Sequence, residues 1–237
     1  VVSCDDLITE LLGWRPDDVV GRVALDVVAP ADLAAAGAFR EQVAASENAS
    51  TVECRLLTAD GGERWVALHA QAIRWSSGEI RGIVGGFRDC QAEVLFRRAA
   101  TTLSATNAIL VRATDEPGLL SSMCDAAVAR GGYRSSWYGR AHGEDAVRFV
   151  AHSGAVETLL GTLVQRYGSK LLGGGPTGQV ARSGVTQVSG SPRDHPEYEP
   201  WGSVMADLDV ESAITVPVFV DGVSDGALTV CAAEHDA

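Results

Sequence analysis

Residues 51–72, TVECRLLTADGGERWVALHAQA, contain the pattern that decides the fold of the first part of the chain. In the first half of this stretch, apolar and polar residues alternate, which is the two-residue period of a strand with one buried face. Asp60-Gly61-Gly62 then supplies the residues of a tight turn, and a second strand follows over residues 64–72. The stretch predicts an antiparallel hairpin.

A third strand is predicted directly after this hairpin, over residues 80–88. It contains Gly82, Gly85 and Gly86, although glycine weakens a strand because it has no side chain to pack. We expect these glycines to permit close packing against a helix or a ligand.

Short helices are predicted upstream of the hairpin, over residues 5–47. Gly13 ends a first run of leucines at helical spacing, and a longer helix is expected to start at Asp32 as its N-cap. The inward face of that longer helix is formed by Leu33, Ala36, Phe39 and Val43.

A single helix is predicted over residues 89–110, downstream of the third strand. Its apolar and small residues form a narrow stripe with spacings of three or four, made of Leu95, Ala99, Leu103, Thr106 and Leu110. A narrow seam suits a parallel contact between two chains better than burial in a globule. The helix is therefore expected to join two domains and to support a homodimer.

The rest of the chain predicts a second sheet with helices around it. Strands are expected over residues 133–141, 146–152, 185–189, 212–220 and 226–233, and helices over residues 117–130, 155–167, 177–182 and 198–208. The predicted fold class is α+β, with two domains that each contain a central antiparallel sheet flanked by helices. The expected boundaries are a first domain at 1–89, a linker helix at 90–110 and a second domain at 111–237.

Composition excludes several classes of protein. The formal net charge of −12 argues against a nucleic-acid partner, because phosphates would be repelled. No apolar run approaches the length of a membrane-spanning helix, so we expect no membrane contact by this segment and a cytoplasmic location. The five cysteines are odd in number and far apart in sequence, which favours free thiols over a disulfide framework.

The sequence contains no recognisable catalytic or metal-binding motif, and we expect no metal site. No Gly-x-Ser-x-Gly elbow or Glu-x-x-His pair is present. The glycine-rich residues 173–178 lack the Lys-Ser/Thr ending of a phosphate loop, so they predict a turn and a helix start. Surface or structural roles are favoured for His69 and His142, and His152 remains a weak ligand candidate in the second domain. No catalytic residue and no cofactor can be assigned.

Four aromatic residues of the second half are the candidate ligand-binding residues. These are Trp137, Tyr138, Phe149 and Trp201. They either line an apolar cleft between the sheet and its helices or simply fill the core.

The first half of the chain resembles a PAS domain. The matching residues are 11–14 (LLGW), Gly21, Pro30, Asp32, Leu33, 60–62 (DGG), Trp65, Val66, Gly85, Arg88 and Asp89. In the family, a hydrophobic residue and a threonine often follow this aspartate, whereas Cys90 and Gln91 stand here. The resemblance implies a sensory domain whose first strand is missing or only begun at Val1.

The second half resembles a GAF domain of the kind attached to bacterial diguanylate cyclases, phosphodiesterases and histidine kinases. The matching residues are 112–116 (RATDE), 131–134 (GGYR), Trp137, 175–178 (GPTG), 200–201 (PW) and Pro217. The resemblance implies cyclic di-GMP or histidine kinase signalling and an output domain in cis, with the last helix of the family expected to be missing after Ala237. These motifs indicate a fold and do not identify a ligand.

Three functions are compatible with these observations. The first is a non-catalytic input module that binds a small ligand, or receives a signal from a partner domain, and relays it through the linker helix. The second is a thiol redox enzyme similar to GAF-type methionine sulfoxide reductases, in which Cys124 and Cys231 are the only cysteines of the second domain. The third is a structural scaffold without a ligand.

Overall fold

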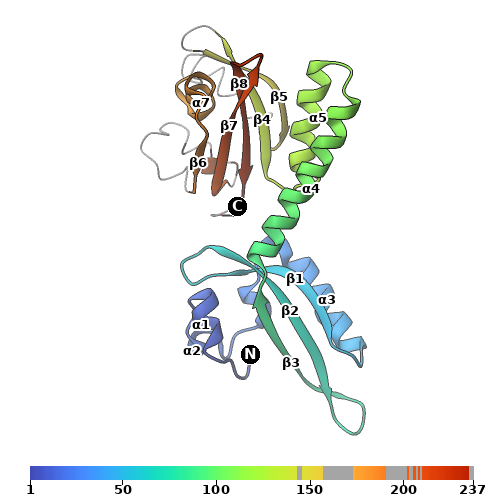
Figure 1. The fold of residues 1–237 in the computed structure, drawn as a ribbon. Coiled ribbons are helices and arrows are strands. Elements are labelled where there is room, and N and C mark those ends of the chain that lie inside the picture. Colours follow the sequence, from blue (N-terminus) through green and yellow to red (C-terminus); the bar gives the residue numbers. More distant parts are fainter. Residues whose placement is uncertain are drawn as a thin grey trace. The chain divides into compact units, whose positions relative to one another are not determined.

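The computed structural model describes residues 1–142, 146–156, 173–190, 202, 205–206, 208 and 210–234. The chain divides into two compact units, residues 1–95 and 96–237 (Figure 1). Each unit is built on an antiparallel sheet with helices beside it, so the predicted α+β class is confirmed. Among the described residues, no helix is both long enough and apolar enough to cross a membrane.

Unit 1 contains a three-stranded sheet in the order β1-β2-β3. Its elements are α1 (Leu7–Leu12), α2 (Pro16–Val19), the 3₁₀ helices η1 (Ala24–Val27) and η2 (Pro30–Asp32), α3 (Leu33–Ala45), β1 (Ser50–Leu57), β2 (Glu63–Arg74) and β3 (Ile80–Asp89). The predicted hairpin is confirmed: β1 and β2 are antiparallel with Cys54 opposite Val66, and Gly61 has a φ of 90° in the turn.

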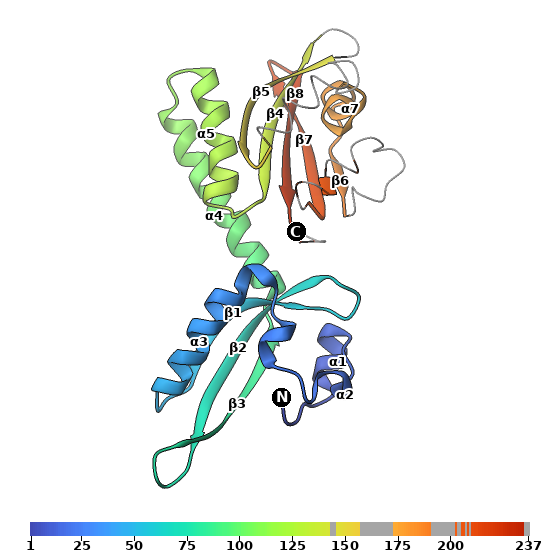
Figure 2. The same ribbon diagram turned by 180° about the vertical axis from the view of Figure 1, so that it is seen from behind.

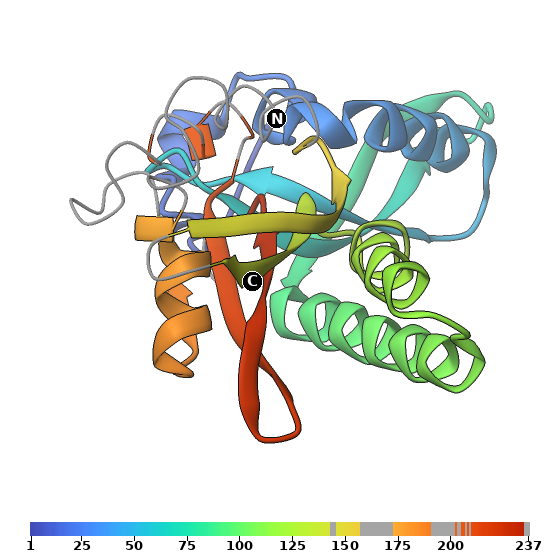
Figure 3. The same ribbon diagram turned by 90° about the horizontal axis from the view of Figure 1, so that it is seen from above.

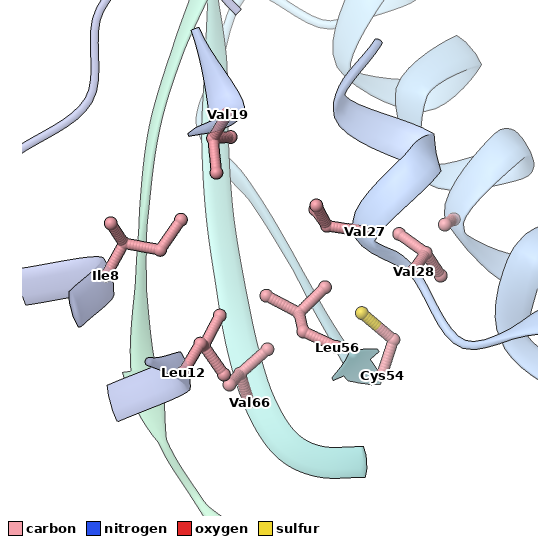
Figure 4. Close-up of a cluster of buried hydrophobic side chains, with 9 residues drawn as sticks. Ile8, Leu12, Val19, Val27, Val28, Cys54, Leu56 and Val66 are labelled. Atoms are coloured by element: carbon pink, nitrogen blue, oxygen red, sulfur yellow. The ribbon is translucent and has the colours of Figure 1, made fainter. Parts of the chain in front are cut away.

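The core of unit 1 lies where the N-terminal helices meet one face of β1 and β2 (Figure 4). Its buried side chains are Ile8, Leu12, Val19, Val27, Val28, Ala36, Cys54, Leu56 and Val66. Burying each aliphatic side chain of this size contributes about 1.5–3 kcal/mol, so this cluster is the main source of stability for the unit. Helix α3 lies alongside the sheet and contacts β1 and β2 (Figure 2).

The start of α3 corrects one prediction. The helix begins directly after Asp32, but the Asp32 carboxylate makes no cap hydrogen bond. Instead it accepts hydrogen bonds from the backbone N–H and the guanidinium of Arg55, at 2.8–3.1 Å. A guanidinium is a stronger partner than a backbone N–H, which explains the difference. Ala36 and Val43 are buried as predicted, whereas Leu33 is 42% exposed.

The glycines of β3 are also only partly as predicted. A Cβ at Gly85 would lie 2.6 Å from the carbonyl oxygen of His69 on the neighbouring strand, so this position requires glycine. A Cβ at Gly82 or Gly86 would meet no described atom within 4 Å. Close packing therefore explains one glycine of the three, and it is packing against a strand rather than a helix or a ligand.

Unit 2 contains a five-stranded sheet in the order β5-β4-β8-β7-β6. Its elements are the part of α4 (Gln91–Arg112) from Phe96 onward, α5 (Glu116–Ala129), β4 (Ser135–His142), β5 (Ala146–Gly154), α7 (Pro176–Ser183), β6 (Gln187–Ser189), β7 (Ser212–Val220) and β8 (Val223–Ala232). Helices α4 and α5 run side by side next to one face of the sheet, and α7 packs on the other (Figure 3). Most of the helices predicted at 155–167 and 198–208 falls outside the described residues.

Two helix starts in unit 2 follow the sequence closely. Asp115 is the N-cap of α5, and its carboxylate accepts a hydrogen bond from the backbone N–H of Gly118 at 2.8 Å. Gly175 and Pro176 start α7, which confirms the turn and helix start predicted for residues 173–178.

Candidate functional site

The predicted aromatic residues do not share one side of the sheet. Trp137 and Tyr138 are consecutive on β4, and successive side chains of a strand point to opposite faces. Trp137 is 5% exposed, faces α7 and packs in a cluster with Met205, Cys231 and the half-buried Phe149. Tyr138 faces α5 on the other side. Trp201 lies outside the described residues, so the structure brings together two of the four predicted residues.

A buried hydrogen-bond network adjoins Trp137. Its indole Nε1–H donates to Thr177 Oγ1 on α7 at 3.0 Å. Thr177 Oγ1 is 3.0 Å from Thr229 Oγ1 on β8, which is in turn 3.0 Å from Thr215 Oγ1 on β7. All four side chains are buried, so each hydrogen bond replaces water that the groups lost on folding. Sequence reasoning assigned no role to these threonines: Thr177 appeared only within the 175–178 motif, and nothing local distinguishes Thr215 and Thr229 from other strand residues.

Gly139 determines how closely α7 approaches this face. A Cβ at that position would lie 2.6 Å from Thr177 Cγ2 and 2.7 Å from Val147 Cγ1, which real side chains do not tolerate. The small residue lets α7 lie directly on β4, next to Trp137. The described part of this face is therefore tightly packed around a polar centre.

The opposite face of the sheet carries a charged network around Tyr138. Its hydroxyl donates to Asp225 Oδ2 at 2.5 Å, and the same carboxylate accepts from Arg140 Nε at 2.9 Å. Arg140 also pairs with Glu116 in the first turn of α5. Burial and the neighbouring Asp225 raise the pKa of Tyr138, so the phenol stays neutral and acts as a hydrogen-bond donor. This network fastens α5 to β4 and β8.

The two cysteines of unit 2 are buried on opposite faces of the sheet. Cys124 on α5 packs beside Tyr138, and Cys231 on β8 packs beside Trp137. Burial raises the pKa of the Cys124 thiol to about 11 and that of the Cys231 thiol to about 12. A nucleophilic cysteine needs an accessible thiolate, and these environments favour the protonated thiol.

The histidines do not form a metal site in the described part of the chain. No group of three or more His, Cys, Asp or Glu side chains is positioned there to hold an ion. His69 lies 3.3 Å from Thr51 Oγ1 on an exposed part of the unit 1 sheet, and His142 is also exposed. His152, the weak ligand candidate, is half-buried on β5 beside Trp137 of β4.

The junction between β3 and α4, within unit 1, is held by polar contacts. Asp89 at the end of β3 accepts hydrogen bonds from the Arg64 guanidinium and from the backbone N–H of Gln91. The Gln91 side-chain oxygen accepts from the backbone N–H of Trp65 on β2 at 3.0 Å. Gln91 stands where the family often has threonine, and its amide ties the first turn of α4 to the sheet. This role was not predicted.

Along its length, α4 has two different faces. Leu95, Thr106 and Ile109 belong to the half-buried side, whereas Phe96, Leu103 and Leu110 are 77%, 62% and 51% exposed. The exposed seam consists of Phe96, Ala100, Leu103, Asn107 and Leu110, with alternating spacings of four and three. The predicted stripe mixed both faces: Leu103 and Leu110 belong to the exposed seam, but Leu95 and Thr106 do not.

An open cavity of about 310 Å³ lies where α4 ends and α5 begins. Ile109 and Leu119 form its apolar part, and Arg112 and Asp115 are its charged residues. The Asp115 carboxylate is already engaged as the N-cap of α5. The Arg112 guanidinium is the cationic group in this open, exposed cavity. We assign no ligand to it.

Comparisons with known proteins agree with this architecture. The PAS fold model matches residues 1–90, and the GAF domain model matches residues 113–237. A search of curated proteins found no match.

Three solved structures illustrate the similarity. A GAF domain from A. aeolicus in an inactive state has 17% identity and a TM-score of 0.45, covering 58% of this chain and 80% of that one. Free methionine-R-sulfoxide reductase from Neisseria meningitidis has 19% identity and a TM-score of 0.44, covering 58% and 74%. The N-terminal domain of a diguanylate cyclase with a PAS/PAC sensor from Marinobacter aquaeolei has 22% identity and a TM-score of 0.34, covering 37% and 82%. From the two family matches, the chain belongs to the GAF domain family and carries a PAS domain in tandem before its GAF domain.

Proposed function

We propose that this chain is a non-catalytic sensory input and dimerisation module of a cytoplasmic signalling protein. A signal received by the PAS unit (1–89) or the GAF unit (111–237) is relayed through the linker helix (90–110) to an output domain in cis. The observation that carries the proposal is α4: its first turn is tied to the unit 1 sheet through Gln91, and the same helix continues into unit 2. A helix held in this way transmits rotation and translation along its length.

The exposed seam of α4 supports a homodimer. Its spacing of four and three residues is the heptad pattern of a coiled coil, with Phe96, Leu103 and Leu110 at one set of core positions. Ala100 and Asn107 occupy the other set, and a polar asparagine at such a position fixes the register and favours two strands. The seam fits a second copy of the same helix in parallel.

A small ligand of the GAF unit is proposed to bind on the face of the sheet that carries Trp137 and Phe149. Trp201, predicted for the same pocket, is kept in this proposal, whereas Tyr138 serves the opposite face. Ligand binding shifts a signalling equilibrium only if the ligand binds one state of the module more tightly than the other.

The alternative of a thiol redox enzyme is disfavoured by one specific observation. Cys124 and Cys231 lie on opposite faces of the sheet and both have raised pKa values, so neither is set up as a nucleophile with the other as resolving thiol. Reductase turnover that is abolished by Cys124→Ser or Cys231→Ser would restore this alternative.

The proposal is tested by the mass of the native particle. We expect native mass spectrometry to show a dimer for the wild-type chain and a monomer for Leu103→Asp, because a charge in the seam cannot be buried unpaired. Ser104→Asp, one residue along the same helix and off the seam, is the matched control and stays dimeric. A dimeric Leu103→Asp chain refutes the seam, and a bound small molecule in the same spectra identifies the ligand.

A further inference from the structure

The helix that enters unit 2 and the strand that ends it are joined by a buried ion pair. Glu234, just after β8, is 4% exposed, and its Oε1 accepts a hydrogen bond from Arg98 Nη1 at 2.7 Å. Arg98 lies on α4 and is 18% exposed. The two residues are 136 positions apart in the chain, so the contact exists only in the folded unit.

The surroundings of this pair fix both partners. The backbone carbonyl of Glu234 accepts from Ser212 Oγ at 2.6 Å, which ties it to the start of β7. On the helix side, a Cβ at Gly132 would lie 3.6 Å from Arg98 Nε, and one at Gly131 would lie 2.2 Å from Thr102 Oγ1. Gly131 therefore lets α4 approach closely, and a side chain at Gly132 would only touch Arg98 at ordinary contact distance.

This pair is sensitive to the position of α4. One residue of helix corresponds to about 1.5 Å of rise and about 100° of rotation, so even a fraction of such a step takes the guanidinium beyond hydrogen-bond distance of Glu234. Losing the hydrogen bond from Arg98 costs more at Glu234, whose side chain is 4% exposed, than losing Arg88 does at Glu93, whose side chain is 58% exposed. Movement of α4 therefore has a direct energetic consequence at the end of β8.

We propose that the Arg98–Glu234 ion pair couples movement of α4 to the end of β8, and so passes a signal through unit 2 without requiring a change on its ligand face. The inference rests on the proposed relay through α4. It adds a specific contact by which the relay reaches the last strand of the unit.

Coupling through this pair is reciprocal, which makes it measurable by hydrogen–deuterium exchange of the full chain. We expect Glu234→Gln to raise amide exchange in residues 98–106 of α4, and Arg98→Met to raise exchange in residues 210–234, each by about tenfold or more. The double variant is expected to equal the larger single effect rather than their sum. Glu93→Gln, which breaks the exposed pair, is the matched control and leaves residues 210–234 unchanged.

Two results would overturn the coupling: each variant speeding exchange only in its own element, or single effects that add in the double variant. If a single variant loses its circular dichroism, Arg98→Met with Glu234→Gln carries the test, because it removes both charges of the pair together. Both elements must then exchange faster than in the wild type. If the Leu103→Asp chain stays dimeric but the ion-pair variants show reciprocal exchange, only the dimer seam is refuted. If the Leu103→Asp chain is monomeric but the ion-pair variants show no reciprocal exchange, only the coupling through the ion pair is refuted.

Discussion

Units 1 and 2 use different polar chemistry to hold their sheets. In unit 1 the centre is Arg55, whose guanidinium pairs with Asp32 at 2.9 Å and Glu63 at 3.1 Å and lies over the ring of Trp65. In unit 2 a charged network holds the face toward α5, and the face toward α7 has a neutral chain of hydrogen bonds from Trp137 through the three threonines.

The two networks differ in the charge of their polar groups and in how much hydration those groups keep in the folded state. The Arg55 side chain is 15% exposed and its two carboxylates are 17% and 26% exposed, so these charges keep part of their hydration. The threonine hydroxyls are buried but uncharged, which lowers the cost of removing them from water. Of these two networks, the one in unit 1 should therefore lose more when a charged partner is removed than the one in unit 2 does when a hydroxyl is removed.

The largest expected effect is from Asp32→Ala. This change removes three hydrogen bonds to Arg55, whose guanidinium keeps its ion pair with Glu63, and it should cost about 2–3 kcal/mol of unit 1 stability. Urea unfolding followed by hydrogen exchange of unit 1 peptides measures the loss, with Asp17→Ala on exposed α2 as the control. A loss of less than about 1 kcal/mol would show that the network is only a surface pair.

Thr229→Val is expected to have a smaller effect, confined to unit 2. Valine keeps the volume but removes the central hydroxyl, so Thr177 and Thr215 each lose a partner at a cost of about 1–2 kcal/mol. The same measurement on unit 2 peptides checks this. Thr186→Val, at an exposed position, should change stability by less than about 0.5 kcal/mol. Equal effects of the two substitutions would mean that the hydroxyl chain contributes nothing.

The sequence predicted elements whose signal is local. The hairpin over residues 51–72 and the long linker helix have clear periodicity and turn residues, and Asp115 carries its own capping pattern. Pairings between distant residues were not predicted in the same way. Asp32 was expected to cap α3, but its partner Arg55 is 23 residues away and nothing near Asp32 indicates it.

The candidate site shows the same limit. The strand alternation already implied that Trp137 and Tyr138 point to opposite faces, so grouping them in one pocket overlooked information that the sequence contained. The threonine network instead depends on the β7–β8 register, which pairs Thr215 with Thr229, and on the position at which α7 packs against the sheet. For α4, periodicity identified a helix, but only packing determined that Leu95 turns inward and Phe96 outward.

The smallest expected effect is the pH dependence of the β3–α4 junction in unit 1. It separates the charged contacts of unit 1 from the threonine network of unit 2, because threonine hydroxyls do not titrate at acidic pH. Partial burial favours the neutral form of Asp89, but hydrogen bonds from Arg64 and Gln91 outweigh it, so the pKa of Asp89 is lowered. Stability from this group is complete above the unfolded pKa of about 3.9 and is lost as pH falls through the lower folded value. After correction for the intrinsic exchange rate at each pH, the protection of residues 89–95 against hydrogen exchange should therefore fall at acidic pH in the wild type and depend less on pH in Asp89→Asn. An equal acid response in both chains would assign the pH dependence to other carboxylates.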